Sequence, residues 1–256
     1  MPKSRKKRKP NWGSVFVVSV LISFIVPAVY LLLRIIFDEE WFSGAGGRGR
    51  EDYVLMLLQC VLGLLAILIP ARLMRRWDIE IPRTMFLLYI GFLYCAIFLG
   101  EVRSFYYTVP HWDTILHIFS GGMLGALGFS MIAVFNNTER IPMNLSPLFV
   151  AVFAFCFALA LGGVWEIYEF LADIFLGTNM QKFALDDGTP LPGQDALRDT
   201  MKDIIVDALG AVGASTVGYI SLKYEKGWVE KLMIRRQNPH LKKKGSASPH
   251  EHESAE

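Results

Sequence analysis

Apolar residues fall along the chain in six long runs that polar segments separate. The runs are Val15–Leu33, Tyr53–Pro70, Met85–Gly100, Ile115–Phe135, Leu148–Leu176 and Ile204–Leu222. A helix needs about 20 mostly apolar residues to cross the hydrocarbon core of a bilayer, and each run is near that length or longer. The pattern therefore predicts an all-α fold, a polytopic membrane helix bundle with about six transmembrane helices.

The composition agrees with a membrane protein. Of the 256 residues, 53% are hydrophobic, and the mean hydropathy of +0.36 is too high for an ordinary soluble domain. The first run is longer than the apolar core of a signal peptide, which has about 7–15 residues. Residues 43–47 are also a poor cleavage site so far downstream. We therefore expect the first run to be a retained anchor.

Lysine and arginine predict the orientation, because segments rich in these residues stay in the cytoplasm. Such segments are residues 3–9, residues 71–77, Arg140 and residues 231–244. The connections at the opposite ends of the spans are acidic or mixed, and they comprise residues 37–41, 100–103 and 185–195. Both termini are therefore predicted to be cytoplasmic.

This topology divides the chain into three parts. They are a basic cytoplasmic N-terminus (1–14), a six-helix transmembrane domain (15–222) and a basic, partly disordered cytoplasmic tail (223–256). The basic ends are interpreted as topology determinants that also attract anionic lipid, so we expect the bilayer and no nucleic acid as partner. Residues 224–236 are basic and aromatic, which suits an interfacial helix. The three cysteines lie inside predicted spans and are interpreted as small apolar fillers.

Polar residues in the last three runs form one-sided stripes. Asp113 and His117 stand four residues apart, which places them on one face of a helix. The other stripes comprise Glu166, Glu169 and Asp173 on the fifth run, and Asp199, Asp203 and Asp207 at the head of the sixth. In the predicted topology all three stripes lie on the extracytoplasmic side, and the connections favour neighbouring helices. We therefore expect these residues to converge.

The charge balance of this group decides how it is interpreted. Each ionised side chain at the bilayer centre costs about 2.5–3.5 kcal/mol on insertion scales, so such residues face a protein interior or a wet cavity. Arg198 and Lys202 each precede an Asp, so we expect them to point about 100° away from the stripe. Arg103 is the cation that we expect to pair with it. The excess negative charge predicts protons, a divalent cation or a cationic ligand.

Carboxylates with one imidazole form an oxygen-rich ligand set. It suits Mg²⁺, Mn²⁺ or Ca²⁺, with Zn²⁺ as an alternative through the imidazole. The predicted metal ligands are Asp113, His117, Glu166, Asp199, Asp203 and Asp207. Such an ion would polarise a phosphoryl or carbonyl oxygen or lower the pKa of a water. A remaining carboxylate would act as general base, and the candidates for catalysis are Glu166, Glu169 and Asp203.

Structural roles compete with ligand binding for several of these residues. Asp113, Asp195 and Asp199 stand where helices are expected to begin, so each is also a candidate helix cap. Glu166 and Glu169 are alternatively satisfied by tyrosine or tryptophan donors inside the bundle. Glycines in the fourth and sixth runs predict close helix packing, and they comprise Gly121, Gly122, Gly125, Gly128, Gly210, Gly213 and Gly218.

The polar motifs resemble those of the YjdF-type and VanZ-like bacterial membrane proteins. These families share an Asp-x3-His at the head of one helix, an acidic residue on the next, and an Asp-x3-Asn/Asp-x2-Gly on the last. The matching positions here are Asp113, His117, Glu166 or Glu169, Asp203, Asp207 and Gly210. The resemblance covers roughly residues 53–222. Asp207 stands where VanZ-like sequences usually have Asn, which favours the YjdF-type match.

The resemblance implies a multi-pass protein of the bacterial cytoplasmic (inner) membrane. VanZ-like members are associated with glycopeptide tolerance, and the resemblance supplies no reaction. Three hypotheses follow for this chain. The first is a membrane-embedded, metal-dependent enzyme that acts on a lipid or cell-envelope substrate at the outer leaflet. The others are a cation- or proton-coupled carrier and a non-catalytic envelope or antibiotic-tolerance factor. The sequence leaves the substrate and the oligomeric state open.

Overall fold

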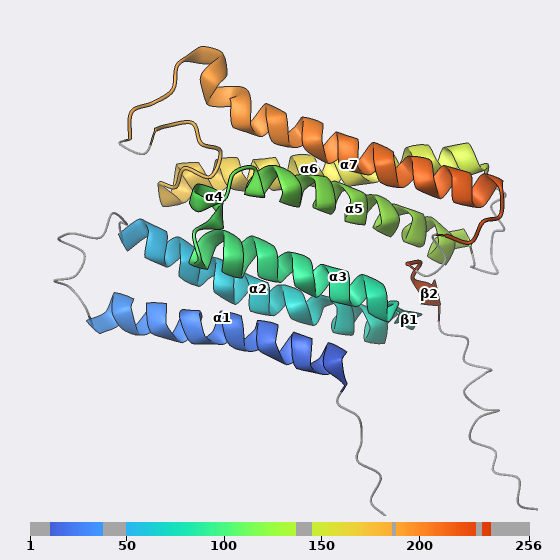
Figure 1. The fold of residues 1–256 in the computed structure, drawn as a ribbon, viewed down its shortest axis with the longest axis horizontal. Coiled ribbons are helices and arrows are strands. Elements are labelled where there is room, and N and C mark those ends of the chain that lie inside the picture. Colours follow the sequence, from blue (N-terminus) through green and yellow to red (C-terminus); the bar gives the residue numbers. More distant parts are fainter. Residues whose placement is uncertain (1–10, 38–49, 137–144, 186–187, 229–231, 237–256) are drawn as a thin grey trace, which may run out of the picture.

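The computed structural model describes residues 11–37, 50–136, 145–185, 188–228 and 232–236, and helices dominate this part of the chain (Figure 1). The long helices are α1 (Trp12–Phe37), α2 (Arg50–Trp77), α3 (Arg83–Leu93), α5 (Trp112–Asn136), α6 (Pro147–Leu176) and α7 (Arg198–Lys223). Shorter elements are the π-helix η2 (Tyr94–Val102), α4 (Phe105–Thr108), the 3₁₀-helix η3 (Gly193–Leu197), β1 (Ile79–Glu80) and β2 (Arg235–Arg236).

The prediction of an all-α polytopic bundle is confirmed. Six helical segments among the described residues are long and apolar enough to cross a membrane, with η2 extending α3 and η3 preceding α7. Local signals fix some ends: the Ser146 hydroxyl accepts from the Phe149 amide at 3.2 Å at the start of α6. Gly177, with φ of 67°, ends that helix in the left-handed conformation. Arg140, residues 186–187 and the predicted disordered tail lie outside the described residues.

The helices form two groups. Helices α1, α2 and α3 pack around an apolar cluster of Val20, Phe24, Ile67, Ile90 and Leu93. Helices α5, α6 and α7 pack on one another, with a cluster of Phe129, Ile132, Val150, Ala151 and Ala154 among them. Figure 1 shows the groups side by side, with α1 at one edge of the bundle and α7 at the other. All three polar stripes therefore belong to one three-helix group.

The two ends of the bundle differ. The connection through α4 and the loop between α6 and α7 lie at one end, whereas the β1–β2 pair and the C-terminus of α7 lie at the other (Figure 1). The interfacial helix suggested for residues 224–236 is not found in the described part of that segment. Arg236 and Arg235 instead pair with Ile79 and Glu80. Ile234 is buried against Ile79 and Met85, so this segment gains apolar packing that a surface helix would lose.

Glycines bring α5 and α7 into backbone contact. A Cβ on Gly121 would collide with the Asp207 carbonyl oxygen, and one on Gly210 would collide with the Ile118 carbonyl oxygen. The predicted close packing is therefore present at these two positions. Gly213, by contrast, has no neighbour within 4 Å of such a Cβ. The close approach matters because it sets how near the polar stripes of the two helices come.

Gly210→Ala should destabilise the protein, and Gly213→Ala should not. The first variant forces α7 away from α5, at a cost of about 1–3 kcal/mol of unfolding free energy. The second gains helix propensity worth up to about 1 kcal/mol and meets no atom. Thermal unfolding in detergent compares the pair. Equal melting temperatures would contradict the helix contact.

Candidate functional site

The predicted site residues lie at the end of the bundle that holds α4 and the α6–α7 loop. Asp113 and His117 occupy the first turns of α5, and the acidic stripe of α7 begins in its first turn. Helix α6 adds Glu166, Glu169 and Asp173 near its C-terminus, all three of them buried. Asp203 and Asp207 are 1% and 2% exposed. The predicted convergence on one end of three helices is therefore observed.

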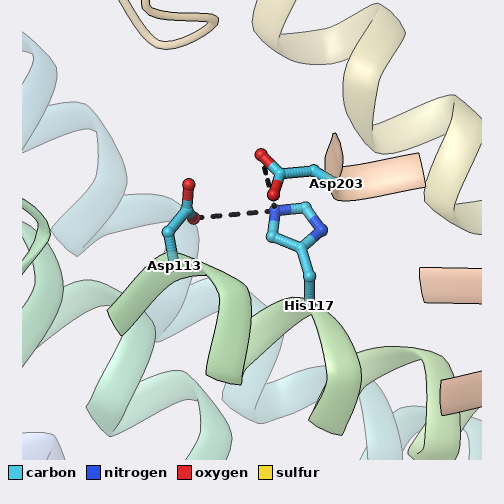
Figure 2. Close-up of side chains that lie close together, drawn as sticks. All are labelled: Asp113, His117 and Asp203. Carbon is cyan, nitrogen blue, oxygen red and sulfur yellow. Dashed lines mark ion pairs between the residues drawn. The ribbon is translucent and has the colours of Figure 1, made fainter. Parts of the chain in front are cut away.

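His117 lies among three carboxylates. Its Nε2 atom is 3.6 Å from Asp113 Oδ1 and 3.9 Å from Asp203 Oδ2 (Figure 2). Its Nδ1 atom is 3.3 Å from Asp207 Oδ2. With a proton on Nδ1, the imidazole donates to Asp207 and leaves the Nε2 lone pair facing the other two carboxylates. Carboxylates from two helices thus fix the orientation of one ring.

The Asp207 carboxylate is itself held in place. The Ser120 hydroxyl, which also bonds to the His117 carbonyl oxygen, donates to Asp207 Oδ1 at 3.1 Å. On the facing helix, a Cβ at Gly162 would collide with Asp207 Oδ2. Gly162 therefore leaves the room that this carboxylate uses. No sequence motif singled out Ser120 or Gly162, because both act across a helix contact.

Two lysines neutralise part of the acidic group. Lys182 Nζ donates to Asp113 Oδ2 at 2.7 Å and to Asp199 Oδ2 at 2.9 Å. Burial lowers the pKa of this ammonium, but the two carboxylates outweigh burial and hold the pKa above its ordinary value. Lys202 Nζ lies 3.5 Å from Asp203 Oδ1 and 3.9 Å from Asp199 Oδ1. Lys182 therefore clamps the first turns of α5 and α7 together.

These contacts correct two predictions about the cations. Lys202 does not point away from the stripe, because its four-carbon stem bends back toward Asp199 and Asp203. Arg103, the expected partner, makes no ion pair with any residue that the structure describes. Its place is taken by Lys182, which the sequence analysis missed. No periodic pattern marks this residue, since it lies in the loop after α6.

The acidic residues of α6 have different environments. Glu169 Oε1 accepts from Trp165 Nε1 at 2.9 Å, which is the tryptophan donor that one alternative predicted. Both Glu166 carboxylate oxygens are buried and make no hydrogen bond within the described part of the chain. Of the acidic residues of α6, Glu166 is therefore the one whose carboxylate has no hydrogen-bond partner among the described residues.

Asp173 has a structural role. Its Oδ1 accepts from the Thr178 hydroxyl at 2.6 Å and from the Met180 amide at 2.7 Å. Its Oδ2 accepts from the Gln181 amide at 3.0 Å. These bonds shape the loop immediately before Lys182. Asp173 therefore positions the lysine and is not one of the groups around His117.

The cap predictions for α7 and α5 are wrong. Leu197 is the N-cap residue of α7 and makes no side-chain cap bond, so neither Asp195 nor Asp199 caps this helix. Asp195 lies in η3, and Asp199 is in the first turn of α7. Helix α5 begins at Trp112, which places Asp113 inside its first turn. Asp113 and Asp199 instead accept hydrogen bonds from the Lys182 ammonium group.

Two further groups, Glu101 and Tyr106, were not among the predicted site residues. Glu101 in η2 is 8% exposed, and Tyr106 in α4 is half-buried. Burial, followed by the charges of Asp113, Glu101 and Glu169, holds the pKa of Tyr106 well above its ordinary value. Its phenol is therefore neutral and available as a hydrogen-bond donor. A buried acid at the end of the third apolar run was the only sequence signal.

The geometry limits which predicted ligands can share one ion. Ligand atoms of Asp113, His117 and Asp203 lie within 4.8 Å of one another. Cis ligands with bonds of about 2.1 Å lie about 3 Å apart, within about 1 Å of the spacing observed around His117 Nε2. Among the remaining predicted ligands, Asp207 binds the other ring nitrogen and Asp199 binds Lys182. One nitrogen and two carboxylates therefore form the set that suits a divalent ion.

These observations define a multi-pass helical membrane protein with a buried Asp–His group at one end of a three-helix packing unit. Residues 28–224 match the DUF2238 family, described as a predicted membrane protein. This match covers more than half of the chain, so the protein belongs to the DUF2238 family. It also includes every predicted site residue. Comparison with curated proteins and with solved structures returns no match.

Asp173→Ala should loosen the loop that carries Lys182. Three hydrogen bonds to a carboxylate are lost, each worth about 1.5–3 kcal/mol. We expect faster hydrogen–deuterium exchange at the Met180 and Gln181 amides and a lower melting temperature. Asp195→Ala, at an exposed position of η3, is the control and should change neither. Unchanged exchange in Asp173→Ala would refute the role given to this carboxylate.

Cysteine labelling tests the predicted orientation. We expect Gln194→Cys, at the site end, to react with an impermeant maleimide on intact cells. Lys226→Cys, at the other end, should react only after permeabilisation. Both positions are exposed, and Cys60, Cys95 and Cys156 would first be replaced. The reverse pattern would place the site on the cytoplasmic side.

Proposed function

We propose that the protein is a membrane-embedded, metal-dependent enzyme that acts on a lipid or cell-envelope substrate from the extracytoplasmic side. The main support is the position of His117. Its Nδ1 atom faces Asp207, and its Nε2 atom faces the Asp113 and Asp203 carboxylates. A histidine that ligates a metal usually donates its other ring nitrogen to a carboxylate or carbonyl. Asp207 fits this outer role, and the Nε2 side fits a divalent ion.

The charge balance supports a cation at this place. Asp113, Asp199, Asp203 and Asp207 provide four carboxylates, whereas Lys182 and Lys202 provide two ammonium groups. Asp203 Oδ1 is buried without a hydrogen-bond partner among the described residues. Removing a carboxylate from water without such partners is costly. A divalent ion bound by Asp113, His117 and Asp203 would balance this charge.

The residues suit hydrolysis or group transfer. A bound ion would supply Lewis-acid polarisation of a phosphoryl or carbonyl oxygen. In hydrolysis, water would attack that centre and lose a proton to Glu166. Glu166 would then pass this proton to the leaving group as the bond to that group breaks. Glu166 suits the role of base because its carboxylate is buried and lacks a hydrogen-bond partner among the described residues. Glu169 is already bonded to Trp165 and is the weaker candidate.

The resemblance to YjdF-type and VanZ-like proteins supports a location in the bacterial inner membrane. The basic segments support cytoplasmic termini, with residues 15–222 as the membrane domain. A cation- or proton-coupled carrier would need ionisable groups beyond the site. The parts of α5 and α6 that lead from the site to the opposite end of the bundle are residues 118–136 and 147–165. These two stretches contain no Asp, Glu, Lys, Arg or His. The enzyme is therefore preferred to the carrier.

Equilibrium binding of Mn²⁺ to the purified protein, followed by electron paramagnetic resonance, tests the metal site. Asp113→Asn, His117→Asn and Asp203→Asn should each weaken Mn²⁺ binding at least 100-fold. Asp207→Asn leaves the three ligands in place and should weaken binding about 10–100-fold. Asp195→Asn, which removes an exposed acid of the same end, should have no effect.

Two results would overturn this proposal. One is the absence of stoichiometric Mn²⁺, Zn²⁺ or Ca²⁺ binding to folded wild-type protein. The other is equal weakening by Asp195→Asn and Asp203→Asn, which would mean that the ion senses only the general negative charge. Thermal unfolding of every variant shows whether lost binding reflects lost folding.

A further inference from the structure

A pocket of about 220 Å³ lies beside the His117 group and is not explained by the metal site. It is formed by the connection from α4 into the first turn of α5, together with two lysines from outside that segment. The residues that matter for its chemistry are Tyr107, Trp112, Asp113, Thr114, Lys182 and Lys202. Asp113 belongs both to this pocket and to the group around His117. A molecule in the pocket would therefore be adjacent to the proposed ion.

Two buried polar atoms on the pocket residues lack partners. Trp112 Nε1 and Thr114 Oγ1 make no hydrogen bond within the part of the chain that the structure describes. The indole N–H is a donor only, and the hydroxyl can donate. Buried donors without acceptors are costly and rare in folded proteins. An acceptor oxygen of a ligand that reached either atom would satisfy it.

The lysines give the pocket its charge preference. Lys182 uses two of its three N–H donors on Asp113 and Asp199. Lys202 lies near two carboxylates at 3.5 and 3.9 Å without a hydrogen bond to either. Each ammonium therefore retains free donors, and both side chains are 41% exposed. Among the pocket residues, two ammonium groups oppose one carboxylate, Asp113.

The pocket lies at the N-terminal end of a membrane span. The start of a 25-residue helix also carries a partial positive charge that favours anions. Tyr107, on the pocket wall, is 70% exposed. Exposed tyrosine is enriched at the level of lipid head groups. The surroundings therefore favour an anionic head group over a small molecule from bulk water.

We propose that this pocket binds the phosphate of a lipid head group and presents it to the ion held by Asp113, His117 and Asp203. Trp112, Thr114, Lys182 and Lys202 would donate hydrogen bonds to the phosphate oxygens. The role of this pocket as a substrate site rests on the proposed function, whereas phosphate binding itself does not. The shared chemistry is a phosphate ester, and soluble phosphate is the competing source.

The experiment measures binding of three probes to the full-length protein in maltoside micelles, by titration calorimetry. They are dihexanoyl phosphatidic acid, dihexanoylglycerol, which lacks the phosphate, and inorganic phosphate. Wild-type protein should bind phosphatidic acid at least tenfold more tightly than either other probe. Binding of dihexanoylglycerol as tight as phosphatidic acid would overturn the proposal. Equally tight inorganic phosphate would support the phosphate site and reject the lipid as its source.

An isosteric double variant, Trp112→Phe with Thr114→Val, removes the two unpaired donors. It should weaken phosphatidic acid about tenfold without lowering the melting temperature, because the buried donors had no partner to lose. Lys202→Gln should weaken it by about tenfold as well, through the lost charge-assisted bond. Thr108→Val is the matched control, since this pocket residue already donates its hydroxyl to the Ser104 carbonyl oxygen at 3.0 Å. It should leave the affinity unchanged.

Mn²⁺ affinity, measured on the same samples, separates the two proposals. The double variant should retain wild-type Mn²⁺ binding. Phosphatidic acid binding that the double variant weakens, in a protein that binds no metal, would support the pocket and reject the metal enzyme. Metal binding with no phosphatidic acid binding, or with a double variant that binds it like wild type, would overturn the pocket alone.

Discussion

The cost of burying carboxylates at one end of three packed membrane helices governs this structure. Three aspartates from α5 and α7 surround one imidazole, and with Asp199 they meet only two ammonium groups. In a bilayer each unbalanced charge costs several kcal/mol, and the cost falls only if a positive group is enclosed with the acids. The four carboxylates outnumber the two ammonium groups, and the proposed ion would offset this imbalance. The pocket beside it has the opposite preference, because two ammonium groups outnumber its one carboxylate.

The packing of α5 against α7 sets the distances between these charged groups. Gly121 and Gly210 let the two backbones touch, so Asp207 lies within 3.3 Å of His117 although 90 residues separate them. Gly162 then leaves room for the same carboxylate on the side of α6. Asp173 shapes the loop that delivers Lys182 to both helices. Each element thus fixes one partner of the group, and no single helix contains the site.

Features that repeat along one helix could be predicted from the sequence. Contacts between segments far apart in the chain could not. Apolar run length is sufficient to find the six helices, and the four-residue spacing is sufficient to place Asp113 beside His117. The clamp by Lys182 joins residues 69 and 17 positions away, and no periodicity marks such a contact. Arg103 and Lys202 were misjudged because helix position fixes the direction of a Cα–Cβ bond and not the end of a long side chain. The roles of Ser120 and Gly162 likewise depend on a neighbouring helix.

The central claim is that Asp113, His117 and Asp203 hold one divalent ion. Anomalous diffraction from crystals of the protein grown with Mn²⁺ tests it most directly. The account predicts a single strong anomalous peak within bonding distance of His117 Nε2 and of both carboxylates, with Asp207 on Nδ1. A peak bound elsewhere, or no peak at this position at a Mn²⁺ concentration that saturates the protein in solution, would contradict it.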